Sequence, residues 1–126
     1  MPDPADKQIV FVCEHGALRS RIAAAYFNAA APVGWSAVSA GVTPQDAVSP
    51  RLEPLMAGTG VEEFVDAAPP RHLSSASASR VAAIDIDVSG VDMWRTDPTT
   101  ADEGLRDDIR DRVARLVAEV AGTPAL

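Results

Sequence analysis

The sequence predicts an α/β fold of three layers, in which a parallel four-stranded sheet is flanked by helices. Apolar β-forming stretches alternate with helix-forming stretches in the order strand, helix, strand, helix, strand, loop, helix. A fourth strand is expected within the late loop, near residues 91–94. With 126 residues, of which 47% are hydrophobic, the chain suits one domain with its own core. We expect residues 1–7 to form a flexible tail and residues 8–126 to form this domain.

The first half of the chain has regular strand and helix signals. A strand is expected at residues 8–12, where four apolar residues follow Gln8 without alternation, as in a strand buried on both faces. A helix follows over residues 19–31, because this stretch is rich in alanine and other helix formers, and Pro32 ends it. The second strand covers residues 35–42 and ends in a glycine turn.

The next part of the chain is less regular. A second helix is expected with Ser49 as N-cap and Pro50 at its first position, and it should end near residues 58–60. Residues 67–80 are rich in serine and alanine, which fits either a loop with one short helical turn or a mobile segment. A third strand is expected at residues 81–88, where apolar residues mostly alternate with aspartates.

The last helix has the clearest pattern. Its apolar residues recur at intervals of three and four, so they share one face, and Gly122 and Pro124 close the helix. We expect this face to pack on the core. Its residues are Leu105, Ile109, Val113, Leu116, Val117 and Val120.

Charge and composition limit the partners. The chain has 18 acidic and 11 basic residues and a formal net charge of −7, so neither nucleic acid nor an anionic membrane is expected as a partner. An anionic small substrate would need a locally positive pocket. The sequence has no apolar stretch of about 18 residues and its first residues are acidic and polar, so we expect a cytoplasmic protein.

The one cysteine, Cys13, stands where the first strand ends, and Arg19 and Ser20 follow where the next helix begins. Ligands of parallel sheets bind at the carboxyl ends of the strands. Backbone amides of residues 14–19 and the helix dipole would form an anion site there if the loop curls ahead of the helix. Arg19 adds a planar fork for a tetrahedral oxyanion, and this positive field favours a nucleophilic thiolate.

The whole loop is therefore a candidate oxyanion site. Gly16 fits, because a loop that turns its amides toward one point needs a residue with positive φ. The opposing interpretation is that Cys13 is a small buried residue at a strand end, as most free cysteines are. The spacing Cys-x5-Arg-Ser between a strand and a helix favours the functional interpretation. The candidate oxyanion-binding residues are Glu14, His15, Gly16, Ala17, Leu18, Arg19 and Ser20.

The stretch "VFVCEHGALRSRIAAAYF" resembles the nucleophile loop of the low-molecular-weight protein tyrosine phosphatase and arsenate reductase superfamily. Three further stretches resemble that superfamily in the same order: "VSAGV" its second strand, "VSPRLEPLMAGTGVE" its proline-led helix, and "WRTDP" the late loop with an aspartate followed by proline. Residues 67–92 match only loosely. The resemblance implies a low-molecular-weight phosphotyrosine phosphatase-like fold.

The resemblance also implies roles for single residues. Cys13 would be the nucleophile, Arg19 the oxyanion clamp, Ser20 the hydroxyl that assists the thiolate, and Asp97 the acid that protonates the leaving group. Asp-Pro is also a common turn pair, so other acids stay open. These nearby alternatives are Asp92, Asp102 and Glu103.

Three positions depart from the superfamily pattern. The superfamily usually has Asn where this chain has Gly16, so the side-chain hydrogen bonds of that Asn to the loop are lost. Leu18 stands where many of the phosphatases have a second cysteine, and Thr99 stands where the tyrosine phosphatases have an aromatic residue. A reductase relay with three cysteines is excluded, whereas a single-cysteine reductase that uses an external thiol remains open.

Three functions fit this pattern. The first is hydrolysis of phosphate esters through a phosphocysteine, the second is arsenate reduction with an external small thiol or redoxin, and the third is oxyanion binding without catalysis. The expected ligand is a small tetrahedral oxyanion or a phosphorylated substrate. Two histidines and one cysteine, widely spaced, do not form a metal site, and no cofactor is expected.

Overall fold

A computed structural model of the chain describes residues 7–75, 80–91, 93–97 and 101–122. Its strands are all parallel and form one sheet in the order β2-β1-β3-β4. They are β1 (Lys7–Cys13), β2 (Trp35–Gly41), β3 (Arg80–Ile84) and β4 (Met93–Trp94). This sheet confirms the expected fold class, including the short strand near residue 93. The strand β1 begins at Lys7, one residue inside the expected tail, and residues 1–6 lie outside the described residues.

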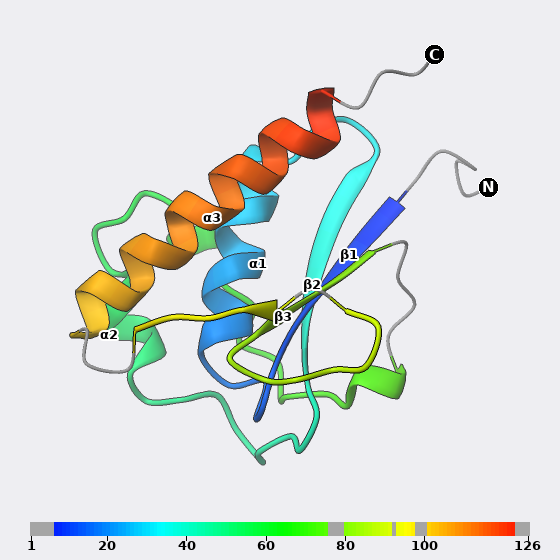
Figure 1. The fold of residues 1–126 in the computed structure, drawn as a ribbon. Coiled ribbons are helices and arrows are strands. Elements are labelled where there is room, and N and C mark those ends of the chain that lie inside the picture. The colour runs from blue at the N-terminus through cyan, green and yellow to red at the C-terminus, as the bar shows by residue number, and fades with distance from the viewer. Residues whose placement is uncertain (1–6, 76–79, 92, 98–100, 123–126) are drawn as a thin grey trace.

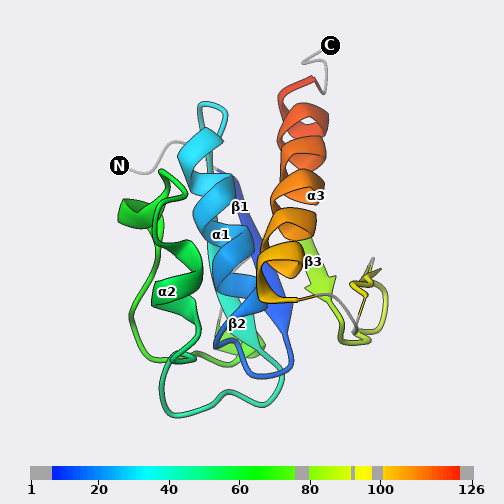
Figure 2. The same ribbon diagram turned by 90° about the vertical axis from the view of Figure 1, so that its left-hand side faces the viewer.

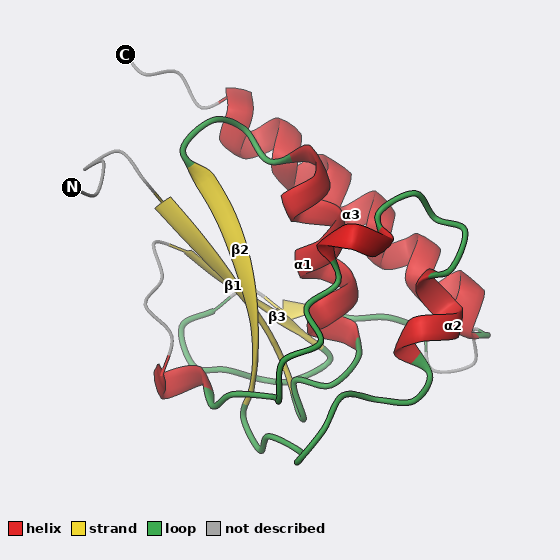
Figure 3. Ribbon diagram, turned by 180° about the vertical axis from the view of Figure 1, so that it is seen from behind, coloured by secondary structure: helices red, strands yellow, loops and turns green. Residues whose placement is uncertain are grey.

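The α-helices lie on one side of the sheet (Figure 1, Figure 3). On the other side, where the third of the expected layers would be, the described residues form one short 3-10 helix, η2 (Leu73–Ser75). Figure 2 looks onto the helical side, where α1 lies between α2 and α3. The helices are α1 (Arg19–Ala30), α2 (Leu52–Met56) and α3 (Asp102–Gly122), and a second 3-10 helix is η1 (Glu62–Phe64). No helix in the described part of the chain is both long and apolar enough to cross a membrane.

The core lies between the central strand β1 and the helices. Phe11 of β1 contacts Phe27 of α1 and Trp94 of β4, with ring centroids 6.0 Å and 5.7 Å apart. The apolar face expected for the last helix is confirmed, because all its members are buried except Val117, which is partly buried. Burial of each such side chain stabilises the fold by about 1.5–3 kcal/mol. This core fixes the end of β1, and therefore the position of Cys13.

The helix α2 is shorter than expected and begins at Leu52 rather than at Pro50. A turn precedes it, in which the Arg51 amide donates to Ser49 Oγ at 3.2 Å and the Leu52 amide donates to the Ser49 carbonyl at 3.1 Å. Pro54 explains the late start, because it has no N–H that could donate to the carbonyl of residue 50.

The strand β3 is also shorter than expected and ends at Ile84 rather than at residue 88. Asp85 has a φ of +55°, a left-handed conformation that turns the chain out of the strand. Its amide donates to the Trp94 carbonyl at 2.9 Å. The alternation that continues through Ile86 and Val88 therefore belongs to a loop.

Candidate active site

Cys13 is the last residue of β1, and the loop of residues 14–18 joins it to α1, which begins at Arg19. The side chains of Cys13 and Ser20 are both buried. Cys13 Sγ and Ser20 Oγ form a hydrogen bond at 3.2 Å, in which a thiol would donate and a thiolate would accept. The structure therefore brings together two of the residues expected at the site.

The carbonyl oxygens of residues 13–18 all accept hydrogen bonds. Donors come from the segment after β2 and from α1. The amides of Val42, Thr43, Gln45 and Ser49 donate to the carbonyls of Cys13, Glu14, His15 and Ala17 at 3.1, 2.7, 3.2 and 3.0 Å. Arg21 Nε donates to the Gly16 carbonyl at 2.8 Å, and the Arg21 and Ile22 amides donate to the Leu18 carbonyl, each at 3.0 Å.

The amide N–H groups of the same loop, unlike its carbonyls, have no described hydrogen-bond partner. Among the described residues, no hydrogen bond has an amide of residues 14–19 as its donor. In a planar trans peptide the N–H points away from the preceding carbonyl. A loop whose carbonyls are held by surrounding groups therefore keeps its amides available for an anion.

Two glycines bring β2 and the loop into contact. Gly16 has a φ of +64°, which confirms the expected left-handed conformation. A Cβ on Gly16 would lie 2.8 Å from Gly41 N, and a Cβ on Gly41 would lie 2.6 Å from His15 C. The sequence analysis did not identify Gly41 as a contact of the loop, although a glycine at a strand end is typical of close backbone approach.

This contact predicts the effect of restoring the superfamily's residue. Gly16→Asn should lower the stability of this chain by about 1–3 kcal/mol, because the new Cβ meets backbone that cannot easily move. Gly60→Asn is the matched control, since Gly60 has a φ of +87° and open space around its Cβ position. Urea unfolding measures both variants, and equal losses would contradict the steric explanation.

Arg19 points toward Asp85, which follows β3. Arg19 Nε and Asp85 Oδ2 lie 3.1 Å apart as an ion pair, but this N–H is not aligned for a hydrogen bond and has no other acceptor among the described residues. The Asp85 carboxylate also accepts hydrogen bonds from the amide, at 2.7 Å, and from the hydroxyl of Thr96. Asp85 was not among the expected site residues, although its place at the carboxyl end of a parallel strand is a signal for it.

Two cavities flank Arg19. A cavity of about 180 Å³ lies over the loop and is lined by Cys13, Glu14, His15, Ala17, Leu18, Arg19, Gln45, Ser49 and Arg51. A cavity of about 480 Å³ is lined by Arg19, Asp85, Ile86, Asp87, Met93, Arg95 and Thr96. The smaller cavity lies at the loop itself, and Arg19 lines both cavities.

The candidates for the general acid are placed differently from one another. Asp97 is exposed and is not among the described lining residues of either cavity. Asp102 forms a bidentate ion pair with Arg51. The hydrogen bonds from Arg51 lower the pKa of Asp102, so this carboxyl group is held ionised. Glu103 is exposed, and Asp92 lies outside the described residues.

The side chains of the loop differ in their exposure. Ala17 and Leu18 are buried, so only their amides can serve an anion. The His15 ring lies 3.9 Å from the exposed Glu14 carboxylate. In the described parts of the chain, no three residues among His, Cys, Asp and Glu are grouped so that they could hold a metal ion.

No protein-family model and no curated protein sequence matches the chain. Solved structures do match it. The thioredoxin-dependent arsenate reductase of Corynebacterium glutamicum aligns with a TM-score of 0.74 and 19% identity, over 98% of this chain and 66% of that one. The arsenate reductase of Archaeoglobus fulgidus aligns with a TM-score of 0.62 and 25% identity, over 90% of this chain and 98% of that one.

Phosphatases match as well. The YwlE arginine phosphatase of Geobacillus stearothermophilus aligns with a TM-score of 0.70 and 21% identity, over 91% of this chain and 93% of that one. The likeness to both kinds of enzyme confirms the fold that the resemblance in the sequence implies. The same likeness does not separate the two activities, because both kinds of enzyme have this fold.

Proposed function

We propose that this chain, which has the fold of low-molecular-weight protein tyrosine phosphatases and arsenate reductases, is a cysteine-dependent phosphatase. One observation carries the proposal. All carbonyls of residues 13–18 are engaged, and the amides of residues 14–19, in the loop that follows the buried Cys13, donate to no described group. Backbone amides grouped ahead of a helix start bind tetrahedral oxyanions.

The proposed reaction has two steps. The Cys13 thiolate attacks phosphorus in line, so that a P–S bond forms and the bond to the leaving oxygen breaks. Water then attacks the phosphocysteine, the P–S bond breaks, and inorganic phosphate and the thiolate are released. Arg19 and the loop amides hold the phosphoryl oxygens in both steps, and Ser20, which lies 3.2 Å from Sγ, stabilises the departing thiolate.

Asp97 is proposed as the acid that protonates the leaving oxygen. We expect Asp97→Asn to lower kcat by about 10²–10⁴-fold for phenyl phosphate, whose leaving group needs a proton, and far less for p-nitrophenyl phosphate. The measurement is kcat for both substrates. Asp102→Asn is the control, because Arg51 holds that carboxyl ionised. An equal loss with both substrates would show that Asp97 is not the acid.

Arsenate reduction is the second candidate, favoured by the match to arsenate reductases. With Cys13 as the one cysteine, it would need an external thiol. Cys13 would attack arsenate, and water would leave. Two equivalents of an external thiol would then supply the two electrons and become a disulfide, and water would break the As–S bond to Cys13 and release arsenite and the free thiol. The same loop would hold the arsenate oxygens.

The deciding experiment measures the wild-type chain with p-nitrophenyl phosphate at mildly acidic pH, and with arsenate plus a small thiol and a redoxin. Hydrolysis without thiol-dependent arsenate turnover supports the phosphatase. Thiol-dependent turnover with little hydrolysis supports the reductase and contradicts our first choice. Phosphate binding without either activity would leave an oxyanion-binding module.

A further inference from the structure

We propose that Arg21 is a positioning residue that orients the oxyanion loop. Its guanidinium holds the Gly16 carbonyl away from the anion site, and this turns the amide of Ala17, in the same peptide unit, toward the site. The inference rests on the proposed function, because it assigns a residue to the anion site of that function. The described hydrogen bonds of the Arg21 side chain go to backbone carbonyls and not to Cys13.

The side chain of Arg21 is only 1% exposed, which is exceptional for an arginine. Nε donates to the Gly16 carbonyl at 2.8 Å, and Nη1 donates to the Asp66 carbonyl at 2.5 Å. Burial lowers the pKa of the Arg21 guanidinium, and the Asp66 carboxylate partly offsets this effect. Because a buried charge is costly, an arginine here indicates a geometric requirement that an apolar residue cannot meet.

The hydrogen bonds of Arg21 are part of a closed series of contacts that begins and ends at Gly16. The Asp66 carboxylate lies 3.5 Å from Arg71 Nη2, and the Gly41 amide donates to the Arg71 carbonyl at 2.9 Å. Gly41 in turn lies against Gly16. The contacts therefore connect Gly16 to Arg21, Arg21 to residues 66–71, and these residues through Gly41 back to Gly16.

The Gly16 carbonyl differs from the other carbonyls of the loop. In the described contacts, the carbonyls of residues 13–15, 17 and 18 accept from backbone amides, which almost any sequence supplies. The Gly16 carbonyl accepts from a side chain. Gly16 also lacks the Asn side chain that orders the loop in the resembling superfamily. Arg21 thus supplies, from the first turn of α1, the hydrogen bond that fixes this part of the loop.

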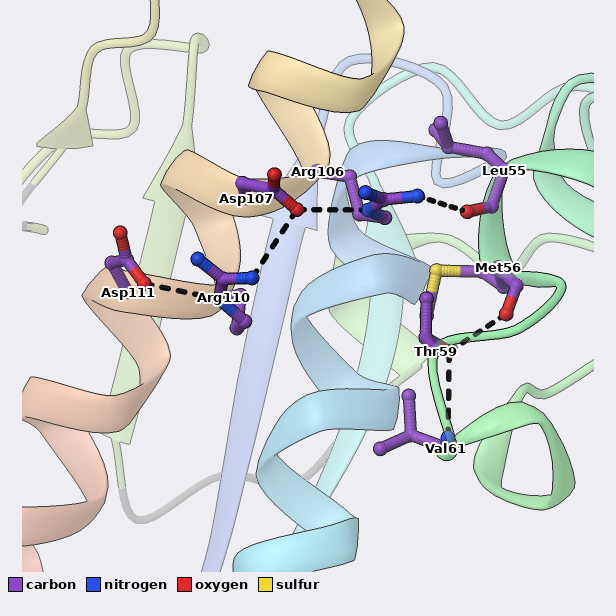
Figure 4. A network of polar contacts seen from close by, with 8 residues as sticks. All are labelled: Leu55, Met56, Thr59, Val61, Arg106, Asp107, Arg110 and Asp111. Carbon is purple, nitrogen blue, oxygen red and sulfur yellow. Dashed lines mark hydrogen bonds and ion pairs between the residues drawn. The ribbon is translucent and has the colours of Figure 1, made fainter.

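The test compares Arg21→Lys with Arg106→Lys. Arg106 is the control, because it also joins a helix, α3, to a distant backbone carbonyl, that of Leu55 at 3.0 Å (Figure 4), and it donates to no carbonyl of the loop among the described hydrogen bonds. Lysine keeps the charge at position 21 but loses the planar fork with two donors. A loss in Arg21→Lys alone would therefore report geometry rather than charge.

Two quantities are measured on the full chain. The first is the dissociation constant for inorganic phosphate by titration calorimetry, which we expect to rise about 10-fold in Arg21→Lys, as when one charge-assisted hydrogen bond is lost. The second is the hydrogen-exchange rate, without ligand, of the Ser49 amide, which donates to the Ala17 carbonyl next to the Gly16 peptide. This rate should rise more than the rates in β1, because a loop released by Arg21 opens that hydrogen bond. Arg106→Lys should change neither quantity more than about twofold.

Each outcome decides something. Unchanged phosphate binding and unchanged Ser49 exchange in Arg21→Lys would overturn the inference and leave the proposed function standing. Absence of phosphate binding in the wild type would overturn the proposed function, and Ser49 exchange would still decide whether Arg21 holds the loop. If Arg21→Lys does not fold, Arg21→Gln is measured instead, and if that also fails to fold, Arg21 is a stability residue and the inference is wrong.

Discussion

Cys13→Ser is expected to abolish phosphate-ester hydrolysis while phosphate binding is retained. We expect kcat to fall by at least about 10³-fold, because a serine hydroxyl is not ionised near neutral pH and is a far weaker nucleophile than a thiolate. The fold should tolerate the change. Cys13 is buried at a strand end beside Ser20, and an oxygen in place of sulfur keeps a hydrogen bond to that hydroxyl.

The two measurements are kcat with p-nitrophenyl phosphate and the dissociation constant for inorganic phosphate. The amides and Arg19, rather than the thiol, make the anion site, so the dissociation constant should stay within about threefold of wild type. Hydrolysis that survives in Cys13→Ser would show that another group attacks phosphorus. Loss of both hydrolysis and binding, in a variant with the wild-type melting temperature, would place Sγ in the binding site itself.

Local patterns predicted the parts of the fold that position this site. The run from Ile9 to Val12 is buried on both faces, as an uninterrupted apolar strand should be, and the apolar face of α3 packs on the core. The loop after β1 was found from the spacing of Cys13 and Arg19 between strand and helix. These signals lie within about one element of the chain, so periodicity and spacing suffice to detect them.

The sequence could not predict features that depend on distant segments. In the sequence, Arg21 looks like any charged residue in the first turn of a helix. Its role could not be predicted, because only the fold brings the Gly16 and Asp66 carbonyls to it. Asp85 continues an alternating strand pattern, yet its φ of +55° turns the chain out of the strand, and its carboxylate accepts hydrogen bonds from Thr96. In both cases the decisive partner lies in another element.

Gly41→Ala should damage the site although it replaces no residue of the loop. The new Cβ would lie 2.6 Å from His15 C and 2.7 Å from Gly16 N, which are backbone atoms. Either the end of β2 moves, which strains the hydrogen bond from the Gly41 amide to the Arg71 carbonyl, or the loop moves away from Cys13. A displacement of about 1 Å in a catalytic site can cost about 10²-fold in rate, so we expect at least that loss in kcat/KM.

The stability cost of Gly41→Ala should be only about 1–3 kcal/mol, as for other overpacked sites. Gly58→Ala is the matched control, because Gly58 has a φ of +81° but open space around its Cβ position. That variant should lose about 1 kcal/mol of stability through backbone strain and keep its full activity.

Both variants are compared by urea unfolding and by kcat/KM at a temperature where each is folded. If Gly41→Ala loses stability but hydrolyses aryl phosphate like wild type, the contact with β2 does not hold the loop in place. If its activity falls while that of Gly58→Ala does not, the fit of β2 against the loop is part of the anion site, through backbone alone.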